Sequence, residues 1–170
     1  MRMLPDASDL VSEGWKRVDE RSWRTGRTGT PSEWGLRARE LKSITAWRSF
    51  EQKAASKWLW TEVVPLSSAD DAGLALRDVP IGFLKNLRAE VTLTDEHTVD
   101  GVTVPGSQAT WAYEQETSGP RGLGMARYLG GTVGPILFLV AGSGLAEAWT
   151  WDDLVSVAET LVLKISQATD

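Results

Sequence analysis

The segment WDDLVSVAETLVLKIS occupies residues 151–166 and decides the fold class. Its apolar residues recur at helical spacing and form one continuous stripe: Leu154, Val155, Ala158, Leu161, Val162 and Ile165. Thr150 stands at the N-cap position, and Asp152 and Asp153 fall in the first turn, where carboxylates interact favourably with the helix dipole. An amphipathic helix of this kind covers an apolar surface. We therefore predict a closing helix that packs on a sheet built by the preceding strands.

The segments before this helix carry strand patterns. Trp58–Val64 is rich in aromatic and β-branched residues and ends at Pro65, which cannot continue a central strand. Pro135–Ala141 is wholly apolar, which predicts a buried strand at the centre of the sheet. Alternating segments predict four further strands, at Trp15–Thr25, Val91–Val99, Ala109–Glu116 and Met125–Leu129. The expected anchors of the first of these strands are Trp15, Val18 and Trp23.

Two further helices and one ambiguous segment complete the prediction. Ser32–Lys42 has a helical composition, and Ser67 or Ser68 caps a helix that ends or kinks at Pro80. Ile44–Phe50 fits both a helix and a strand, and we favour the strand because it supplies an antiparallel neighbour for the next one. The predicted fold class is α+β: an antiparallel sheet flanked by helices, in a single domain over residues 1–170.

Composition excludes several functions. The 170 residues carry a formal charge of −5, which disfavours nucleic acid and anionic membranes as partners. The arginines between Arg17 and Arg27 are interrupted by Asp19 and Glu20, so a solvated strand face is the favoured interpretation there. The absence of cysteine excludes disulfides, thiolate nucleophiles and cysteine zinc sites. No segment predicts a signal peptide or a membrane span, and the expected location is cytoplasmic.

Catalytic chemistry has few candidates in this sequence. His97 is the single histidine, and it lies in a predicted strand beside Asp95, so a two-histidine metal site is impossible. Glu114 and Glu116 share one strand face, for which a solvated surface is the favoured interpretation. We therefore predict no catalytic residue, no metal site and no cofactor.

The glycine-rich stretch between residues 118 and 134 lacks the lysine of a phosphate-binding loop. Ser118–Gly124 is predicted to be a hairpin loop, with Arg121 at its tip as a candidate contact for a partner. Gly130, Gly131 and Gly134 are expected to allow a bend before the apolar strand.

Nine tryptophans in 170 residues are the unusual feature. Trp58 and Trp60 share a strand face, Trp111 lies on a later strand, and Trp149 stands at the start of the closing helix. Tryptophan anchors many interfaces, and it also fills cores because its ring buries a large area. Both interpretations stay open, and Trp58, Trp60, Trp111 and Trp149 are the candidate binding residues.

The order of segments resembles one known group. The chain opens with a segment from Leu4 to Gly14-Trp15. Later comes a strand with the sequence Trp60-Thr61-Glu62-Val63-Val64, and then a helix that starts with Ser68-Ala69-Asp70-Asp71-Ala72. Further strands and a terminal helix follow. This arrangement is similar to the PsbP-like α/β sandwich of small actinobacterial lipoproteins and of the extracellular sensor domains of some mycobacterial serine/threonine kinases. The chain departs from that group in having no lipobox and no cysteines. The resemblance implies a non-catalytic binding or accessory module, and it assigns no site residue.

Three functions are compatible with these observations. The favoured one is a non-catalytic protein-binding or assembly module that contacts a protein partner or a second copy of itself. The second is a small-molecule binder with a tryptophan-lined pocket. The third is a hydrolase or transferase that acts through carboxylates or His97.

Overall fold

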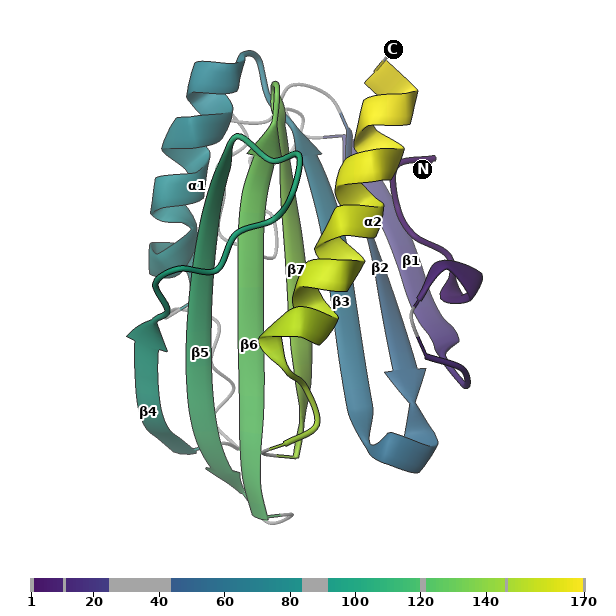
Figure 1. Ribbon diagram of the computed structural model, residues 1–170, viewed down its shortest axis with the longest axis vertical. Coiled ribbons are helices and arrows are strands. Elements are labelled where there is room, and N and C mark those ends of the chain that lie inside the picture. Colours follow the sequence, from purple (N-terminus) through teal and green to yellow (C-terminus); the bar gives the residue numbers. More distant parts are fainter. Residues whose placement is uncertain are drawn as a thin grey trace.

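The computed structural model describes residues 2–10, 12–24, 44–83, 92–119, 122–145 and 147–169. It contains a seven-stranded antiparallel sheet with two α-helices, so the predicted α+β class is confirmed (Figure 1). The elements in chain order are η1 (Ala7–Asp9), β1 (Lys16–Arg24), β2 (Ile44–Gln52), η3 (Lys53–Ala55), β3 (Lys57–Pro65), α1 (Ala69–Phe83), β4 (Thr92–Thr98), β5 (Ala109–Gly119), β6 (Gly122–Val133), β7 (Ile136–Leu145) and α2 (Trp151–Thr169).

Two meanders build the sheet. Strands β1, β2 and β3 pair in sequence, β4 to β7 pair in sequence, and the spatial order is β1-β2-β3-β7-β6-β5-β4. The two meanders join where β7 pairs with β3, antiparallel, over residues 58–65 and 136–143. The apolar strand β7 thus lies at the centre, as its sequence predicts, because neighbours cover both of its edges and helices cover both faces.

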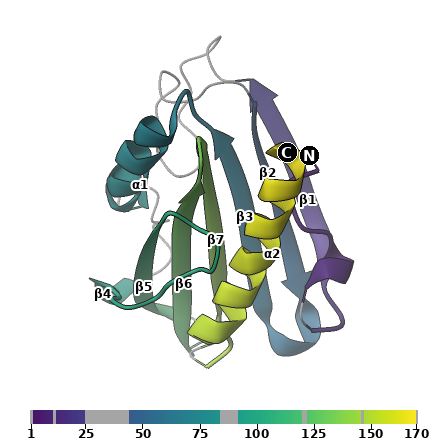
Figure 2. The same cartoon turned by 45° about the horizontal axis from the view of Figure 1, so that its top comes forward.

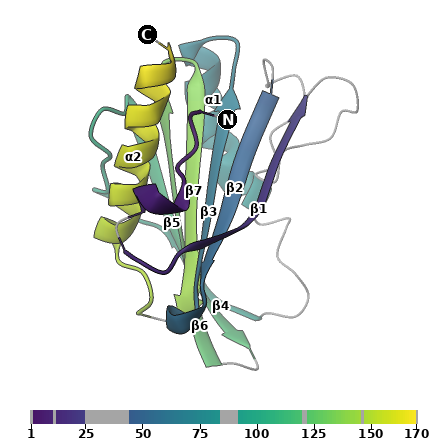
Figure 3. The same cartoon turned by 90° about the vertical axis from the view of Figure 1, so that its right-hand side faces the viewer.

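The two helices cover opposite faces of the sheet. Phe138 and Val140 of β7 belong to the core cluster that includes the α2 stripe, whereas Leu137 and Leu139 pack with Ala72, Ala75 and Leu76 of α1. Because successive residues of a strand point to opposite faces, this alternation assigns one helix to each face. Figure 1 shows α2 crossing the near face, and Figure 3, turned by 90°, shows it on one side of the strands.

Helix α2 begins with a reciprocal cap. The Asp153 amide donates to Thr150 Oγ1 at 3.1 Å, and the Thr150 amide donates to Asp153 Oδ2 at 3.0 Å, so the predicted N-cap is confirmed. The buried residues are Leu154, Val157, Ala158, Leu161, Val162 and Ile165. Val157 is therefore buried although it stood outside the predicted stripe, and Val155 is only partly buried.

Helix α1 begins as predicted and ends later. The Asp71 amide donates to Ser68 Oγ at 3.1 Å, which identifies Ser68 as the cap. Of the two alternatives predicted at Pro80, an end of the helix is wrong, since the helix continues to Phe83, and a kink stays a prediction. Near a helix end, proline removes a single hydrogen bond, and the remaining turn of helix tolerates that loss.

Several strand predictions are confirmed and others need correction. Ile44–Phe50 is a strand, as favoured. The predicted hairpin over residues 118–124 is confirmed, but its loop is shorter than predicted, because Ser118 and Gly119 belong to β5 and Gly122 to β6, with Gly119 paired to Gly122. Val18 is 47% exposed and does not anchor β1. The predicted helix Ser32–Lys42 lies outside the described residues.

The predicted bend at Gly130 and Gly131 is also wrong. Both glycines lie inside β6, and their lack of a side chain serves packing. A Cβ atom on Gly130 would lie 3.0 Å from Leu76 of α1, and one on Gly131 would overlap Phe138. Of these three glycines, only Gly134 has a positive φ, of +53°, and it lies in the turn before β7.

The N-terminal segment is held on the sheet by a buried cation, Arg48 of β2. Its guanidinium donates to the carbonyl oxygens of Leu4 and Pro5 at 3.1 and 2.9 Å and to Asp6 Oδ1 at 2.8 Å. A further hydrogen bond of 2.8 Å goes to Glu20 Oε2 on β1. Figure 2 shows the N-terminal segment on the same side of the sheet as α2.

No helix among the described residues is long and apolar enough to cross a membrane.

Candidate functional site

Three of the predicted binding residues lie on one face of the sheet, the face that α1 partly covers. Trp58 and Trp60 of β3 share the side of Val64, and Trp60 and Trp111 pack against the α1 cluster. Trp60 pairs with Ala141, Ala141 with Tyr128, and Tyr128 with Tyr113, so one row of side chains runs across four strands. We call the set formed by Trp47, Trp58, Trp60, Trp111, Tyr113 and Tyr128 the aromatic face.

Most of the aromatic face is packed. The rings of Trp47 and Trp60 stack with centroids 3.9 Å apart, and those of Trp111 and Tyr113 stack at 5.5 Å. Trp47 is 4% exposed. Side chains held in this way contribute stability by burying aromatic area, and they leave little surface for a ligand.

The two tyrosines are hydrogen-bonded within this face. Tyr113 Oη donates to Glu96 Oε2 on β4, and Tyr128 Oη donates to Gln115 Oε1 at 2.9 Å. Burial, followed by the hydrogen bond to the Glu96 carboxylate, raises the pKa of Tyr113 above its ordinary value. Burial raises the pKa of Tyr128 to about 12. Both phenols are thus held in the neutral form.

The aromatic face is open at the end formed by Trp58. This ring is 46% exposed, and Leu145, on the same face of β7, is 53% exposed. Ser143, which pairs with Trp58 and with Ala126 of β6, is exposed between them. The small side chains of Ser143 and Ala126 leave the two apolar residues projecting from the sheet. We call Trp58, Ser143 and Leu145 the Trp58 patch.

Trp149 lies on the opposite face, inside the core. It is 4% exposed, its ring centroid lies 5.4 Å from that of Trp15, and its Nε1 donates to the carbonyl oxygen of Ser143 at 3.2 Å. A Cβ atom on Gly142 would lie 2.7 Å from the ring, so this glycine makes room for the indole. Trp149 is thus a packing residue in this fold.

Arg121, the other predicted binding residue, lies outside the described residues.

The residues considered for catalysis form a charged surface on β4 and β5. His97 lies opposite Glu114, and Asp95 lies opposite Glu116. His97 Nδ1 is 3.4 Å from Asp95 Oδ2, and the Glu114 carboxylate accepts a hydrogen bond of 2.5 Å from Arg127 Nε. Within the described ranges, no hydroxyl or amine is hydrogen-bonded to His97, and no group of three or more acidic or histidine residues is arranged to hold a metal ion.

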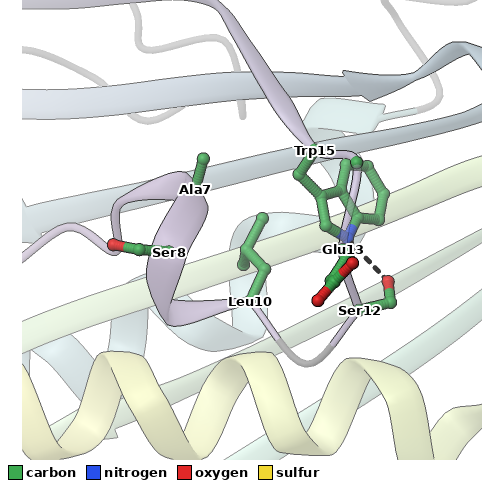
Figure 4. Close-up of a pocket in the computed structure, with 7 residues that line it drawn as sticks. Ala7, Ser8, Leu10, Ser12, Glu13 and Trp15 are labelled. Carbon is green, nitrogen blue, oxygen red and sulfur yellow. Dashed lines mark hydrogen bonds between the residues drawn. The ribbon is translucent and has the colours of Figure 1, made fainter.

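A pocket that the sequence analysis missed lies between η1 and the start of β1. It has a volume of about 330 Å³ and is lined by Ala7, Ser8, Leu10, Ser12, Glu13, Gly14 and Trp15 (Figure 4). Trp15 Nε1 donates to Ser12 Oγ at 2.9 Å, which fixes the indole at the pocket wall. The sequence predicts a strand from Trp15 but offers no signal that places Ala7 and Leu10 beside this indole.

The acidic residues of this segment differ in their partners. Asp6 accepts from Arg48, and Asp9 lies 3.0 Å from Lys164 of α2. The hydrogen bond from the Asp6 amide, together with Lys164, lowers the pKa of Asp9 below its ordinary value. The Glu13 carboxylate, by contrast, takes part in no hydrogen bond or ion pair with any described residue, and only its backbone oxygen is bound, by Gln52 Nε2.

Comparison with known proteins identifies the fold and no family. No protein-family model and no curated protein sequence matches the chain. Among solved structures, the chain is similar to the extracellular domain of PknH from Mycobacterium tuberculosis, with a TM-score of 0.64, 14% identity, and coverage of 97% of this chain and 93% of that one. At this identity the likeness shows the fold alone. It agrees with the expected resemblance to mycobacterial extracellular domains, and no finding supports the PsbP-like assignment.

Proposed function

We propose that the chain is a non-catalytic module that binds a protein partner or a second copy of itself through the Trp58 patch. The carrying observation is that Trp58 and Leu145, two large apolar side chains, project together from one sheet face at 46% and 53% exposure. Covering them with a partner would contribute roughly 1–2 kcal/mol each from apolar burial. The resemblance in fold to an extracellular domain is compatible with such a role.

Site-specific photo-crosslinking tests this proposal. A photoreactive amino acid is placed at Trp58 in one variant and at Leu163 in a control, because Leu163 is 59% exposed on the outer side of α2. We expect position 58 to yield one defined adduct, either with a second copy of the chain in the purified protein or with one protein in the native extract. Sedimentation velocity of the purified protein distinguishes the two sources. A monomer whose adducts are the same from both positions would contradict the proposal.

The second candidate function, a small-molecule binder, is favoured by the pocket at Trp15. Its volume of about 330 Å³ lies at the lower end of the range for small-ligand sites. This candidate keeps the tryptophan-lined pocket of the sequence prediction and moves it from the sheet face to the N-terminal segment.

Two further expectations stay proposals. A single domain over residues 1–170 is supported by one sheet that includes strands from both halves of the chain. A cytoplasmic location has no support from the similar PknH domain, which is extracellular. Fractionation of the source cells with an antibody against the chain decides the location.

A further inference from the structure

We propose that the pocket between η1 and β1 is a binding site for an organic ammonium group, held by the Glu13 carboxylate and the Trp15 ring. This inference gives a ligand class to the small-molecule candidate and is independent of the Trp58 patch. The pocket brings together a carboxylate, an indole and the apolar side chains of Ala7 and Leu10. These are the groups that recognise a cation carried on an alkyl chain.

At two other places in the molecule, a lysine or arginine lies beside both an indole ring and a carboxylate. Lys57 Nζ lies 5.0 Å from the ring centre of Trp149 and 3.9 Å from Asp153 Oδ2. Arg127 lies over Trp151, 5.7 Å from its ring centre, and its Nε donates to Glu114. In each case a cation is shared between an indole and a carboxylate, which is favourable because the ring quadrupole and the negative charge both attract it.

The pocket has the indole of Trp15 and the carboxylate of Glu13, but no lysine or arginine of the described residues lies over this indole. Glu13 has no charged partner among the described residues, whereas Asp6 and Asp9 of the same segment are paired with Arg48 and Lys164. Glu13 and Trp15 both line the pocket, and Figure 4 shows the Ser8 hydroxyl directed to the side away from them. The negative charge of the pocket therefore comes from Glu13 and is available to a ligand.

The pocket wall also sets the shape of the ligand. Leu10 is 8% exposed and Ala7 is partly buried, so an alkyl group beside them leaves water. The indole is held between Ser12 and Trp149, so it needs little reorganisation to receive a cation. A free alkylammonium compound and the lysine side chain of a bound protein share this chemistry, and the experiment separates them.

The test follows the Trp15 indole N–H by two-dimensional NMR during titration with three probes. Choline represents a free ammonium compound, N-acetyl-lysine methylamide represents a lysine side chain, and dimethylbutanol is the neutral analogue of choline with carbon in place of nitrogen. We expect the first two probes to shift the Trp15 signal in a saturable way and the alcohol to leave it unchanged. Tighter binding of choline identifies a free ammonium ligand, and tighter binding of the lysine derivative identifies a protein side chain.

A matched pair of variants supplies the control. Glu13→Gln removes the pocket charge from an exposed side chain, and Asp100→Asn removes an equal charge beyond β4, at the opposite edge of the sheet. We expect Glu13→Gln to weaken binding of the cations by about fivefold or more and Asp100→Asn to leave it unchanged. Equal binding by Glu13→Gln and the natural chain would overturn the proposal. Binding of the alcohol without binding of the cations would also overturn it, while preserving a small-molecule function.

Discussion

At the residue scale, the buried side chain of Arg48 connects the N-terminal segment to strands β1 and β2. It is 7% exposed, and its four acceptors come from the N-terminal segment and from β1. A buried guanidinium is tolerated because each N–H that leaves water finds a carbonyl or carboxylate oxygen. The same contacts bring Leu4 and Pro5 onto the α2 side of the sheet, and thereby position η1 and the pocket.

Replacing Arg48 by methionine tests this role. We expect Arg48→Met to lower the free energy of unfolding by about 2–4 kcal/mol, because it removes four hydrogen bonds and leaves Glu20 without its buried cation. Arg17→Met is the control, since Arg17 pairs with the same Glu20 at 2.7 Å but is 49% exposed, and its loss costs less than about 1 kcal/mol. Urea unfolding measures both. Equal effects of the two variants would show that burial of Arg48 does not matter.

At the element scale, α2 shows how a local pattern becomes a packing interaction. Leu161 is fully buried against the sheet, whereas Leu163, two positions on, is 59% exposed. The helical period of 3.6 residues separates the two leucines by about 200° around the axis. The exposed Leu163 is thus a control, on the same helix, for how much the burial of Leu161 stabilises the protein.

The pair Leu161→Ala and Leu163→Ala measures that value directly. We expect Leu161→Ala to destabilise the protein by about 3 kcal/mol, because it removes buried methyl groups and leaves a cavity under the helix. Leu163→Ala should change stability by less than about 0.5 kcal/mol. Thermal and urea unfolding report both changes. Similar losses from the two substitutions would mean that α2 does not pack on the sheet through this stripe.

Strands β5 and β6 carry the only two tyrosines of the chain, so their ionisation is directly measurable. Both pKa values are raised above 10.0 in the fold, that of Tyr128 to about 12. We expect the ultraviolet absorbance of the folded protein to show almost no tyrosinate at pH 10, where the urea-unfolded chain is about half ionised.

The sign of the stability change follows from these shifts. A raised pKa means that the fold favours the neutral phenol, so this contribution is complete below pH 10 and declines as the pH rises towards the folded-state pKa. Unfolding by base should therefore accompany tyrosinate formation. Ionisation of both tyrosines near pH 10 in the folded protein would contradict the buried geometry of this row.

Sequence patterns predicted the elements more successfully than the site. The α2 stripe, its Thr150 cap and the central strand β7 depend on local periodicity, which is visible in the sequence. Packing between elements is not local: Gly130 of β6 makes room for Leu76 of α1, which lies far from it in the sequence. The same reason separates Trp58, which is half exposed, from Trp60, which is stacked on Trp47. The Glu13–Trp15 pocket depends on how η1 is held by Arg48, which no spacing reveals.

At the scale of the whole molecule, the junction of β3 with β7 joins the two halves of the chain. Pairing within each meander is between neighbours in sequence, whereas this junction encloses α1, β4, β5 and β6. Closing so long a loop costs entropy before the pairing compensates for it, so we expect the junction to form late in folding. During synthesis on the ribosome, one edge of β3 stays unpaired until β7, which begins at Ile136, has been translated. That unpaired edge, with Trp58 and Trp60 on its strand, is a template on which another chain can pair, and we expect chaperones to bind the nascent chain there.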